Sequence, residues 1–93
     1  MRVILDGILY DTEKSEMLIN LKRIISSNNN SLRMYLPYNQ VTTYYRTKKN
    51  TYFEVETVSD KSKIRKISEK EAQRACESDP DVYMRIWGNV EEA

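Results

Sequence analysis

The alternation of apolar and polar positions is clearest between residues 41 and 58, where it predicts a β-hairpin. The first arm, residues 41–48, is rich in Thr and Tyr, and the second, residues 51–58, is rich in aromatic and β-branched residues. Both compositions suit strands on a half-buried sheet. The arms are joined by Lys48-Lys49-Asn50, and because Asn tolerates the left-handed conformation, we predict a three-residue turn with Asn50 at that position.

The second arm of this hairpin also predicts which face of the sheet is buried. Phe53, Val55 and Thr57 share one face of the strand, and Glu54 and Glu56 share the other, because successive side chains of a strand point to opposite sides. We therefore expect one dry face and one wet face, with the two glutamates facing solvent and nearby lysines.

The N-terminal segment contains a second hairpin signal. Apolar runs at residues 2–5 and 8–10 flank Asp6-Gly7, a pair that supplies the positive φ values of a tight turn. Acids and possible N-cap residues follow, so we predict a helix from Thr12 to about Leu18. Residues 19–25 fit a continued helix and a strand about equally well, and the sequence leaves this alternative open.

Turn and strand signals alternate through the middle of the chain. Ser26 to Ser31 is predicted as a polar loop and Leu32 to Leu36 as a strand, which Pro37 either ends or places at a sheet edge. Residues 59–63 are predicted as a charged turn, and residues 64–67 as a short strand or an extended link.

Two helix starts mark the C-terminal third. Ser68 and Glu71 form a capping-box pattern, and Asp79 precedes a proline at the first helical position. The second helix carries an apolar face that we assign to the core, and Gly88 stops it. Residues 1–93 are therefore predicted as a single α+β domain: an antiparallel β-meander of four to five strands with two to three short helices on one face.

Length and composition exclude several classes of protein. Ninety-three residues with 31% charged positions fit one small globular domain. No apolar run approaches the roughly 20 residues of a membrane span, no secretion signal is recognisable, and one cysteine cannot form an internal disulfide. The expected location is cytoplasmic. The net charge of +1 divides unevenly, since residues 40–67 carry seven basic and three acidic residues while residues 68–93 carry three and seven.

Few residues support catalytic chemistry. The chain has no histidine, which removes the commonest general base and metal ligand. Cys76 lies on an apolar helix stripe and is predicted to be a buried small residue. Asp79 and Asp81 are interpreted as helix-capping acids because no calcium-loop pattern follows. We expect a non-enzymatic protein with no cofactor and no metal site.

The best candidate for binding is the basic and aromatic cluster on the predicted hairpin. Its residues suit a protein interface, in which Tyr and Arg are favoured. They also suit RNA or DNA, since aromatic rings stack on bases and cations meet phosphates. An ordinary solvated surface is the third interpretation. We predict a protein partner, with the nucleic acid as the alternative, through Tyr44, Arg46, Lys48, Lys49, Lys63 and Arg65.

Three stretches of the chain carry a family resemblance: VILDGILYDTE, YYRTKKNTYFEVE and KIRKISEKEAQRACE. In order and spacing they resemble a family of short proteins of unknown function found in bacteria and in their phages or mobile elements. The resemblance covers about 45 of the 93 residues, and Asn50 stands where the family pattern has glycine. It carries no catalytic residues over to this chain.

The resemblance implies a phage or mobile-element protein. Small proteins of this kind often inhibit host defence, anti-CRISPR proteins among them. We therefore expect an inhibitor that binds a protein complex of a bacterial host, such as a CRISPR effector, and blocks it sterically. A homodimer formed through an unpaired strand of the meander stays open.

Overall fold

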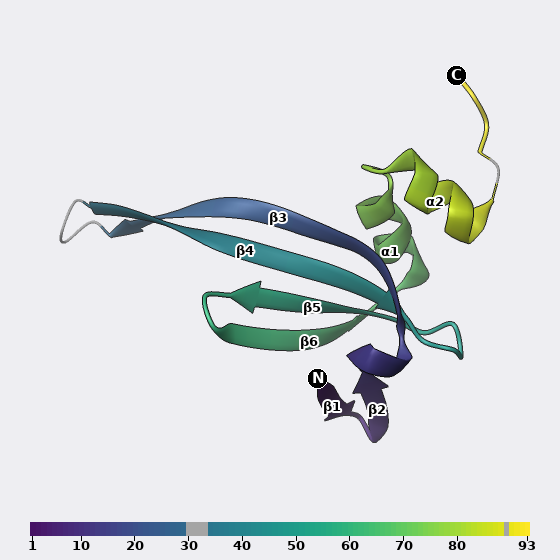
Figure 1. Ribbon diagram of the computed structural model, residues 1–93, viewed down its shortest axis with the longest axis horizontal. Coiled ribbons are helices and arrows are strands. Elements are labelled where there is room, and N and C mark those ends of the chain that lie inside the picture. The colour runs from purple at the N-terminus through teal and green to yellow at the C-terminus, as the bar shows by residue number, and fades with distance from the viewer. Residues whose placement is uncertain (30–33, 89) are drawn as a thin grey trace.

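The computed structural model describes residues 1–29, 34–88 and 90–93, together with the side chains of residues 1–23, 39–88 and 90–93. It is an α+β fold built on an antiparallel β-meander, as the sequence predicts. The described elements, in chain order, are β1 (Arg2–Leu5), β2 (Ile8–Asp11), the 3-10 turn η1 (Thr12–Lys14), β3 (Glu16–Asn29), β4 (Met34–Arg46), β5 (Tyr52–Val58), β6 (Lys61–Ile67), α1 (Glu69–Cys76) and α2 (Pro80–Trp87) (Figure 1).

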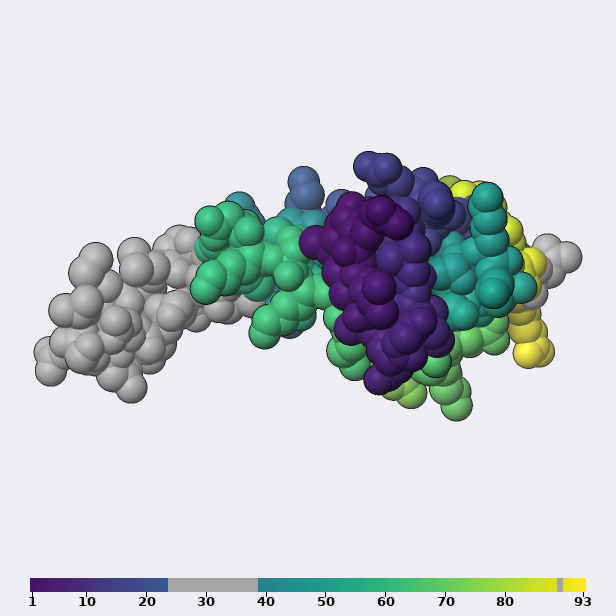
Figure 2. Space-filling model, turned by 90° about the horizontal axis from the view of Figure 1, so that it is seen from below, coloured from purple at the N-terminus to yellow at the C-terminus, as the bar shows by residue number. Residues whose placement is uncertain are grey.

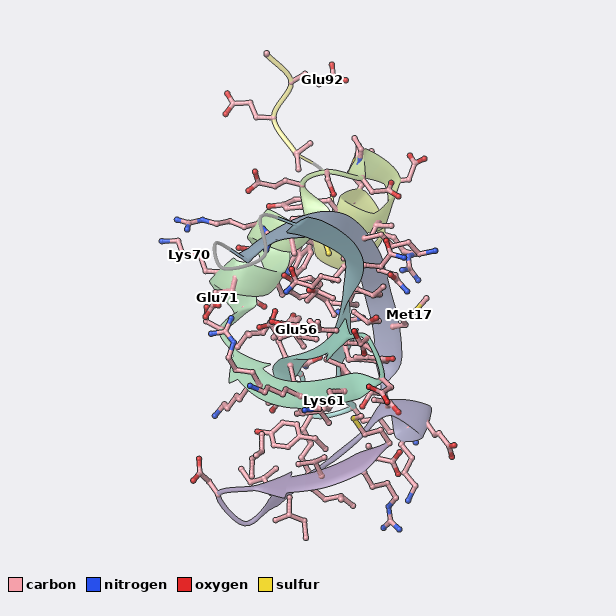
Figure 3. The ribbon with its side chains drawn as sticks, turned by 90° about the vertical axis from the view of Figure 1, so that its left-hand side faces the viewer. Met17, Glu56, Lys61, Lys70, Glu71 and Glu92 are labelled. Atoms are coloured by element: carbon pink, nitrogen blue, oxygen red, sulfur yellow. The ribbon has the colours of Figure 1, made fainter. Side chains whose placement is uncertain are left out.

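The fold has three layers, with the four-stranded sheet β3-β4-β5-β6 in the middle. Helices α1 and α2 cover one face, and the separate two-stranded hairpin β1–β2 covers the other (Figure 3). We call these the helix face and the hairpin face of the sheet. The prediction that the helices lie together on one face is confirmed.

Two apolar clusters hold the layers together. The helix face buries Tyr52 and Ile67 of the sheet against Ala72 and Cys76 of α1. The hairpin face buries Phe53 against Tyr10 of β2, with ring centroids 5.3 Å apart. Because neighbouring side chains of β5 enter different clusters, this short strand is buried on both sides.

The prediction that both glutamates of β5 face solvent is therefore wrong for Glu54, whereas Glu56 is partly exposed and lies opposite Lys63. Glu54 lies on the helix face, next to the buried Tyr52, and only 8% of the residue is exposed. Its carboxylate is paired instead with Arg65 on β6, with Oε1 2.6 Å from the arginine Nε. The two-fold periodicity of the strand was assigned correctly, but periodicity alone does not reveal that a second layer covers the polar positions.

The largest correction concerns the segment after β2. The predicted helix from Thr12 to about Leu18 is only a 3-10 turn, and β3 begins at Glu16. The open alternative for residues 19–25 is resolved as strand. A β-bulge between Met17 and Ile19 interrupts the alternation, and Leu18 and Ile19 both enter the core under the helices. This bulge gives the sequence its partly helical pattern of apolar residues.

Strands β3 and β4 are also longer than predicted. Residues 26–29, expected in a loop, belong to β3, and the remainder of that predicted loop lies outside the described residues. The predicted strand at residues 32–36 begins, in the described part, at Met34 and runs to Arg46. Pro37 does not end it. This proline lies where β4 pairs with β3 alone, since pairing with β5 begins at Gln40, which agrees with the predicted edge position. Strands β3 and β4 extend well beyond β5 and β6 at this end of the sheet (Figure 1).

The turns show how local chemistry sets the register. Asp6 and Gly7 adopt φ values of 52° and 77°, as predicted for a tight hairpin turn. Asn50 has the predicted positive φ, at 61°. The charged turn is shorter than expected, because Ser59, with φ 57°, and Asp60 complete it and β6 begins at Lys61.

The predicted helix starts are confirmed. The Ser68 hydroxyl accepts a hydrogen bond from the Glu71 amide at 3.2 Å, and the Glu71 carboxylate accepts one from the Ser68 amide at 3.4 Å. Asp79 accepts from the Val82 amide at 3.4 Å and caps α2, which ends at Trp87 and is followed by Gly88 as its C-cap. Both caps satisfy amides that have no partner within the helix.

Candidate partner-binding surface

The turn between β4 and β5 has a well-defined backbone that presents two lysines. The Thr47 amide donates to the Thr51 carbonyl at 2.8 Å, and the Asn50 amide donates to the Thr47 carbonyl at 2.9 Å. The Thr51 amide also donates to the Thr47 hydroxyl at 3.1 Å. These bonds enclose Lys48 and Lys49, whose side chains are exposed. Hydrogen bonds therefore fix the backbone before and after the two lysines. Their side chains can contact a partner without a change in the backbone of the sheet.

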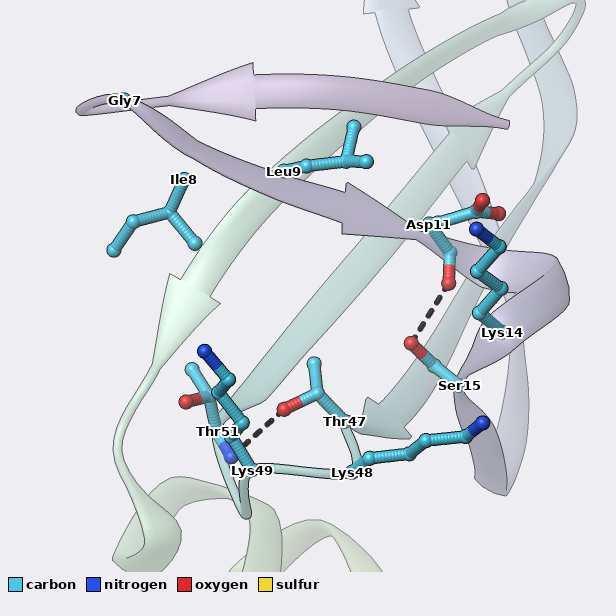
Figure 4. A pocket seen from close by; sticks show the side chains of 10 residues that line it. All are labelled: Gly7, Ile8, Leu9, Asp11, Lys14, Ser15, Thr47, Lys48, Lys49 and Thr51. Atoms are coloured by element: carbon cyan, nitrogen blue, oxygen red, sulfur yellow. Dashed lines mark hydrogen bonds between the residues drawn. The ribbon is translucent and has the colours of Figure 1, made fainter.

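A groove of about 520 Å³ separates this turn from β2 (Figure 4). The turn and the β1–β2 hairpin also lie side by side in the space-filling view (Figure 2). One wall of the groove is formed by β2 with Ile8 and Leu9, and the opposite wall is the turn. Its lining residues are Gly7, Ile8, Leu9, Asp11, Lys14, Ser15, Thr47, Lys48, Lys49 and Thr51.

The groove is lined by three lysines from two distant parts of the sequence. Lys14 from η1 joins Lys48 and Lys49 from the turn, although more than thirty positions separate them along the chain. Asp11 is the acidic residue of the lining, and its carboxylate is already engaged by the Glu13 amide at 3.0 Å and by Arg2 at 3.6 Å. The charge of the lysines is therefore not cancelled by a direct ion pair with Asp11.

Lysines and arginines differ sharply in their partners. All five ion pairs within the described residues are made by arginines, namely Arg2, Arg46, Arg65 twice and Arg85. No lysine in this part of the chain lies within ion-pair distance of an acid. A second recess shares Lys14 and Lys48 with the groove, so these two lysines stand on the ridge between the two depressions.

Arg46, which we predicted to bind a partner, is held within the protein. Its Nη2 donates to Glu16 Oε1 at 2.6 Å, and the other Glu16 oxygen lies 3.7 Å from Arg85 of α2. Burial alone would lower the pKa of Arg46, but the hydrogen bond and charge of Glu16 outweigh burial and raise it. This arginine thus joins β3, β4 and α2 at the base of the turn.

Tyr44 and Arg65, also predicted, lie with Glu54 on the helix face. Arg65 binds the Glu54 carboxylate at 2.6 Å and that of Glu71 at 3.1 Å. Burial, and then the negative charge of Glu54, raise the pKa of the Tyr44 hydroxyl. The contacts with Glu54 raise the pKa of Arg65. Arg65 is exposed to solvent, but its position is set by two acids of the same chain.

Lys63, the last predicted residue, lies elsewhere. It is opposite Glu56 on the β5–β6 ladder and lines a shallow recess at the β5–β6 turn with Ser59 and Lys61. The β4–β5 turn is at the other end of β5. The six predicted residues are therefore not one surface: Lys48 and Lys49 share the groove, whereas the others lie along the sheet.

Sequence reasoning missed Lys14, Ile8 and Leu9 as members of the site. The sequence held one signal: Lys14 follows a hairpin that carries more apolar residues than a two-stranded sheet can bury. The structure leaves Ile8 and Leu9 of this hairpin exposed. Their position next to the turn depends on the packing of β1–β2 on the hairpin face, which no local pattern encodes.

The described residues contain no group of three or more His, Cys, Asp or Glu side chains placed to hold a metal ion. Cys76 is buried, as predicted, and burial raises the pKa of its thiol. Neither described helix combines the length and apolar character needed to cross a bilayer. Among models of protein families, curated proteins and solved structures, none matches this chain.

Proposed function

We propose that this is a non-enzymatic binding protein whose groove lysines, Lys14, Lys48 and Lys49, contact an acidic surface on a protein partner. The observation that supports the proposal is the convergence of these lysines around one groove, while two acids near them, Asp11 and Glu16, are engaged by arginines. Charge that is not used within a small domain is available for steering and holding a partner of the opposite sign.

A protein partner is favoured over a nucleic acid by the state of the aromatic residues. Sequence-tolerant binding of single strands needs exposed rings on which bases stack. Here Tyr45 stacks on Phe53 at 5.0 Å, and Tyr52 is buried beneath α2 beside Trp87. Among the residues whose side chains the structure describes, the groove is lined by Ile8 and Leu9 and by no aromatic ring. Apolar side chains between cations suit a protein surface better than a phosphate backbone.

The biological setting of the proposal is narrower and depends on the family resemblance alone. On that basis the protein is a phage- or mobile-element-encoded inhibitor that acts in a bacterial cytoplasm by covering a surface of a defence complex, such as a CRISPR effector. Lys63 and Arg65 belong to the proposed contact only if the partner extends from the groove along the sheet to β6.

The experiment compares two variants with the same change of net charge. One carries Lys14→Glu, Lys48→Glu and Lys49→Glu. The matched control carries Lys22→Glu, Lys61→Glu and Lys70→Glu, which are exposed and do not line the groove. Each protein is immobilised on a resin and incubated with host lysate, and the bound proteins are identified by mass spectrometry. The purified partner is then titrated into each variant.

We expect the groove variant to bind the purified partner at least about tenfold more weakly, while the control variant binds like the wild type. Equal affinities of the two variants would sink the proposal. Gel-shift titrations test the alternative. If the wild type and the control variant bind DNA or RNA with an affinity that falls steeply with salt, and the groove variant does not bind, the partner is a nucleic acid and not a protein.

A further inference from the structure

The wall of the groove formed by β2 has a backbone edge with a defined pattern. In a hairpin with a two-residue turn, the residues next to the turn exchange backbone hydrogen bonds, and bonded and non-bonded pairs then alternate. This alternation predicts a bond between Met1 and Thr12, and the Thr12 amide indeed donates to the Met1 carbonyl at 3.0 Å. It follows that the backbone groups of Leu9 and Asp11 point away from β1.

These outward groups face the groove. Leu9 and Asp11 both line it, and β2 lies between β1 and the β4–β5 turn (Figure 4). Within the described residues β2 pairs with β1 and with no other strand. The Asp11 carbonyl accepts the Ser15 hydroxyl at 2.7 Å. The Leu9 amide, the Leu9 carbonyl and the Asp11 amide are left for a strand that enters the groove.

We propose that the partner inserts an extended acidic segment, which adds to the free edge of β2 as a third strand of the β1–β2 sheet. This inference rests on the proposed function and deepens it, because it specifies how the partner binds. The backbone of the segment pairs with Leu9 and Asp11, and its carboxylates meet Lys14, Lys48 and Lys49. Strand addition of this kind takes its affinity from main-chain bonds and its specificity from the flanking side chains.

The dimensions and chemistry of the groove fit this occupant. Four residues of β2 span about 13 Å, so the paired segment is about four residues long. Exposed Ile8 and Leu9 offer apolar contact beside the lysines. The outer edge of β6 is the contrasting case. It carries Lys61, Lys63 and Lys66 along a charged strand, a composition that protects edges from pairing.

The test uses a blocked pentapeptide of alternating glutamate and valine, titrated into the isotope-labelled protein and followed by amide chemical shifts. Two N-methylated versions are compared with it, one methylated on the glutamate nitrogens and the other on the valine nitrogens. All three peptides carry the same charge. Because alternate amides of a strand point to opposite sides, pairing with one edge needs only one of the two sets.

We expect shifts centred on Leu9 and Asp11, and we expect one methylated peptide to bind like the parent while the other binds at least about tenfold more weakly. Equal affinities of the three peptides, shifts centred on β6, or no binding at about 1 mM peptide would each overturn the inference.

A protein variant tests the same edge from the other side. Leu9→Pro removes the outward amide at a position that does not donate to β1, where proline is tolerated. Leu9→Ala removes the same apolar side chain and keeps the amide. We expect Leu9→Pro to bind the parent peptide at least about tenfold more weakly than Leu9→Ala does. Equal binding, with unchanged shifts of the β3–β6 sheet in both variants, contradicts the pairing.

The edge pairing of β2 and the lysine surface of the proposed function can be contradicted separately. Suppose the three peptides bind equally and all lose binding to the Lys14→Glu, Lys48→Glu, Lys49→Glu variant. The edge pairing is then wrong, and the lysine surface of the proposed function stands. If instead one methylated peptide binds selectively but the lysine variant binds the parent peptide unchanged, the edge pairing stands and the acidic partner is wrong.

Discussion

Two neighbouring regions of the molecule use cationic side chains in opposite ways: the β4–β5 turn, here called the tip, and the adjoining part of the sheet, here called the base. At the base, Arg46 of β4 and Arg65 of β6 are bound by carboxylates at 2.6 Å, and each connects separate elements of the fold. At the tip, Lys48 and Lys49 are exposed and have no ion-pair partner within the described residues. An arginine fork matches a carboxylate geometrically, whereas a lysine ammonium is a mobile point charge. In this part of the molecule, arginine therefore connects elements of the fold and lysine is left for contact.

The largest effect is expected at the base, from Phe53→Ala. Phe53 is completely buried and packs on Tyr10 and Tyr45, with centroid distances of 5.3 and 5.0 Å. Truncation leaves a cavity between the sheet and β1–β2 and should lower the free energy of unfolding by about 3–5 kcal/mol. Urea denaturation measures the change. A loss below about 1 kcal/mol would mean that the β1–β2 hairpin is not packed on the sheet as described.

A smaller loss is expected from Glu54→Gln. The substitution keeps the shape of the side chain but removes the charge that binds Arg65 at 2.6 Å within a site that is largely buried on the glutamate side. Because Arg65 is exposed and can be solvated, we expect a loss of only about 1–2 kcal/mol. The control is Lys63→Gln, on the same strand as Arg65 and without an ion pair among the described residues, which should change stability by less than about 0.5 kcal/mol. Equal effects of the two substitutions would contradict the structural role of this pair.

Two tyrosines on the helix face, Tyr44 and Tyr52, should make the free energy of unfolding depend on pH in the alkaline range. Burial, and then Glu54 and Glu69 respectively, raise the pKa values of Tyr44 and Tyr52 above the ordinary 10.0. A group whose pKa is raised by folding contributes stability below its unfolded pKa, and this contribution is lost as the pH rises further. Stability should therefore fall above about pH 10. The double variant Tyr44→Phe, Tyr52→Phe should show a shallower fall in thermal unfolding followed against pH, and an unchanged slope would refute this cause.

The parts of the fold that the sequence predicts are those with local causes. Asp6-Gly7 and Asn50 set turns, Ser68 and Asp79 cap helices, and the structure has each where it was expected. The 3-10 turn after β2 was predicted as a helix because its capping signals are genuine. Pairing with β4 then overrides the helical continuation, and such a long-range partner cannot be inferred from propensity.

The candidate site was predictable only in part for the same reason. Lys48 and Lys49 could be found because a turn between two strands must be exposed. The structural role of Arg46 depends on Glu16, thirty positions earlier, and that of Glu54 on the helices above it. Lys14 joins the groove only through the packing of β1–β2 on the sheet. Non-local packing thus decides which charges are used within the protein and which are left over.

The smallest effect on stability is expected at the tip. Replacing Lys48 and Lys49 by alanine removes two charges that make no ion pair, at positions outside both apolar clusters, so the free energy of unfolding should change by less than about 0.5 kcal/mol. The matched variant Arg46→Ala, Arg65→Ala removes the same charge at the base, leaves the buried Glu54 without its partner, and should lose about 2–4 kcal/mol. Chemical denaturation of both variants, with partner titration of the lysine variant, separates stability from binding. A lysine variant as unstable as the arginine variant would show that the tip, too, belongs to the structural network, and that its lysines are not available to a partner.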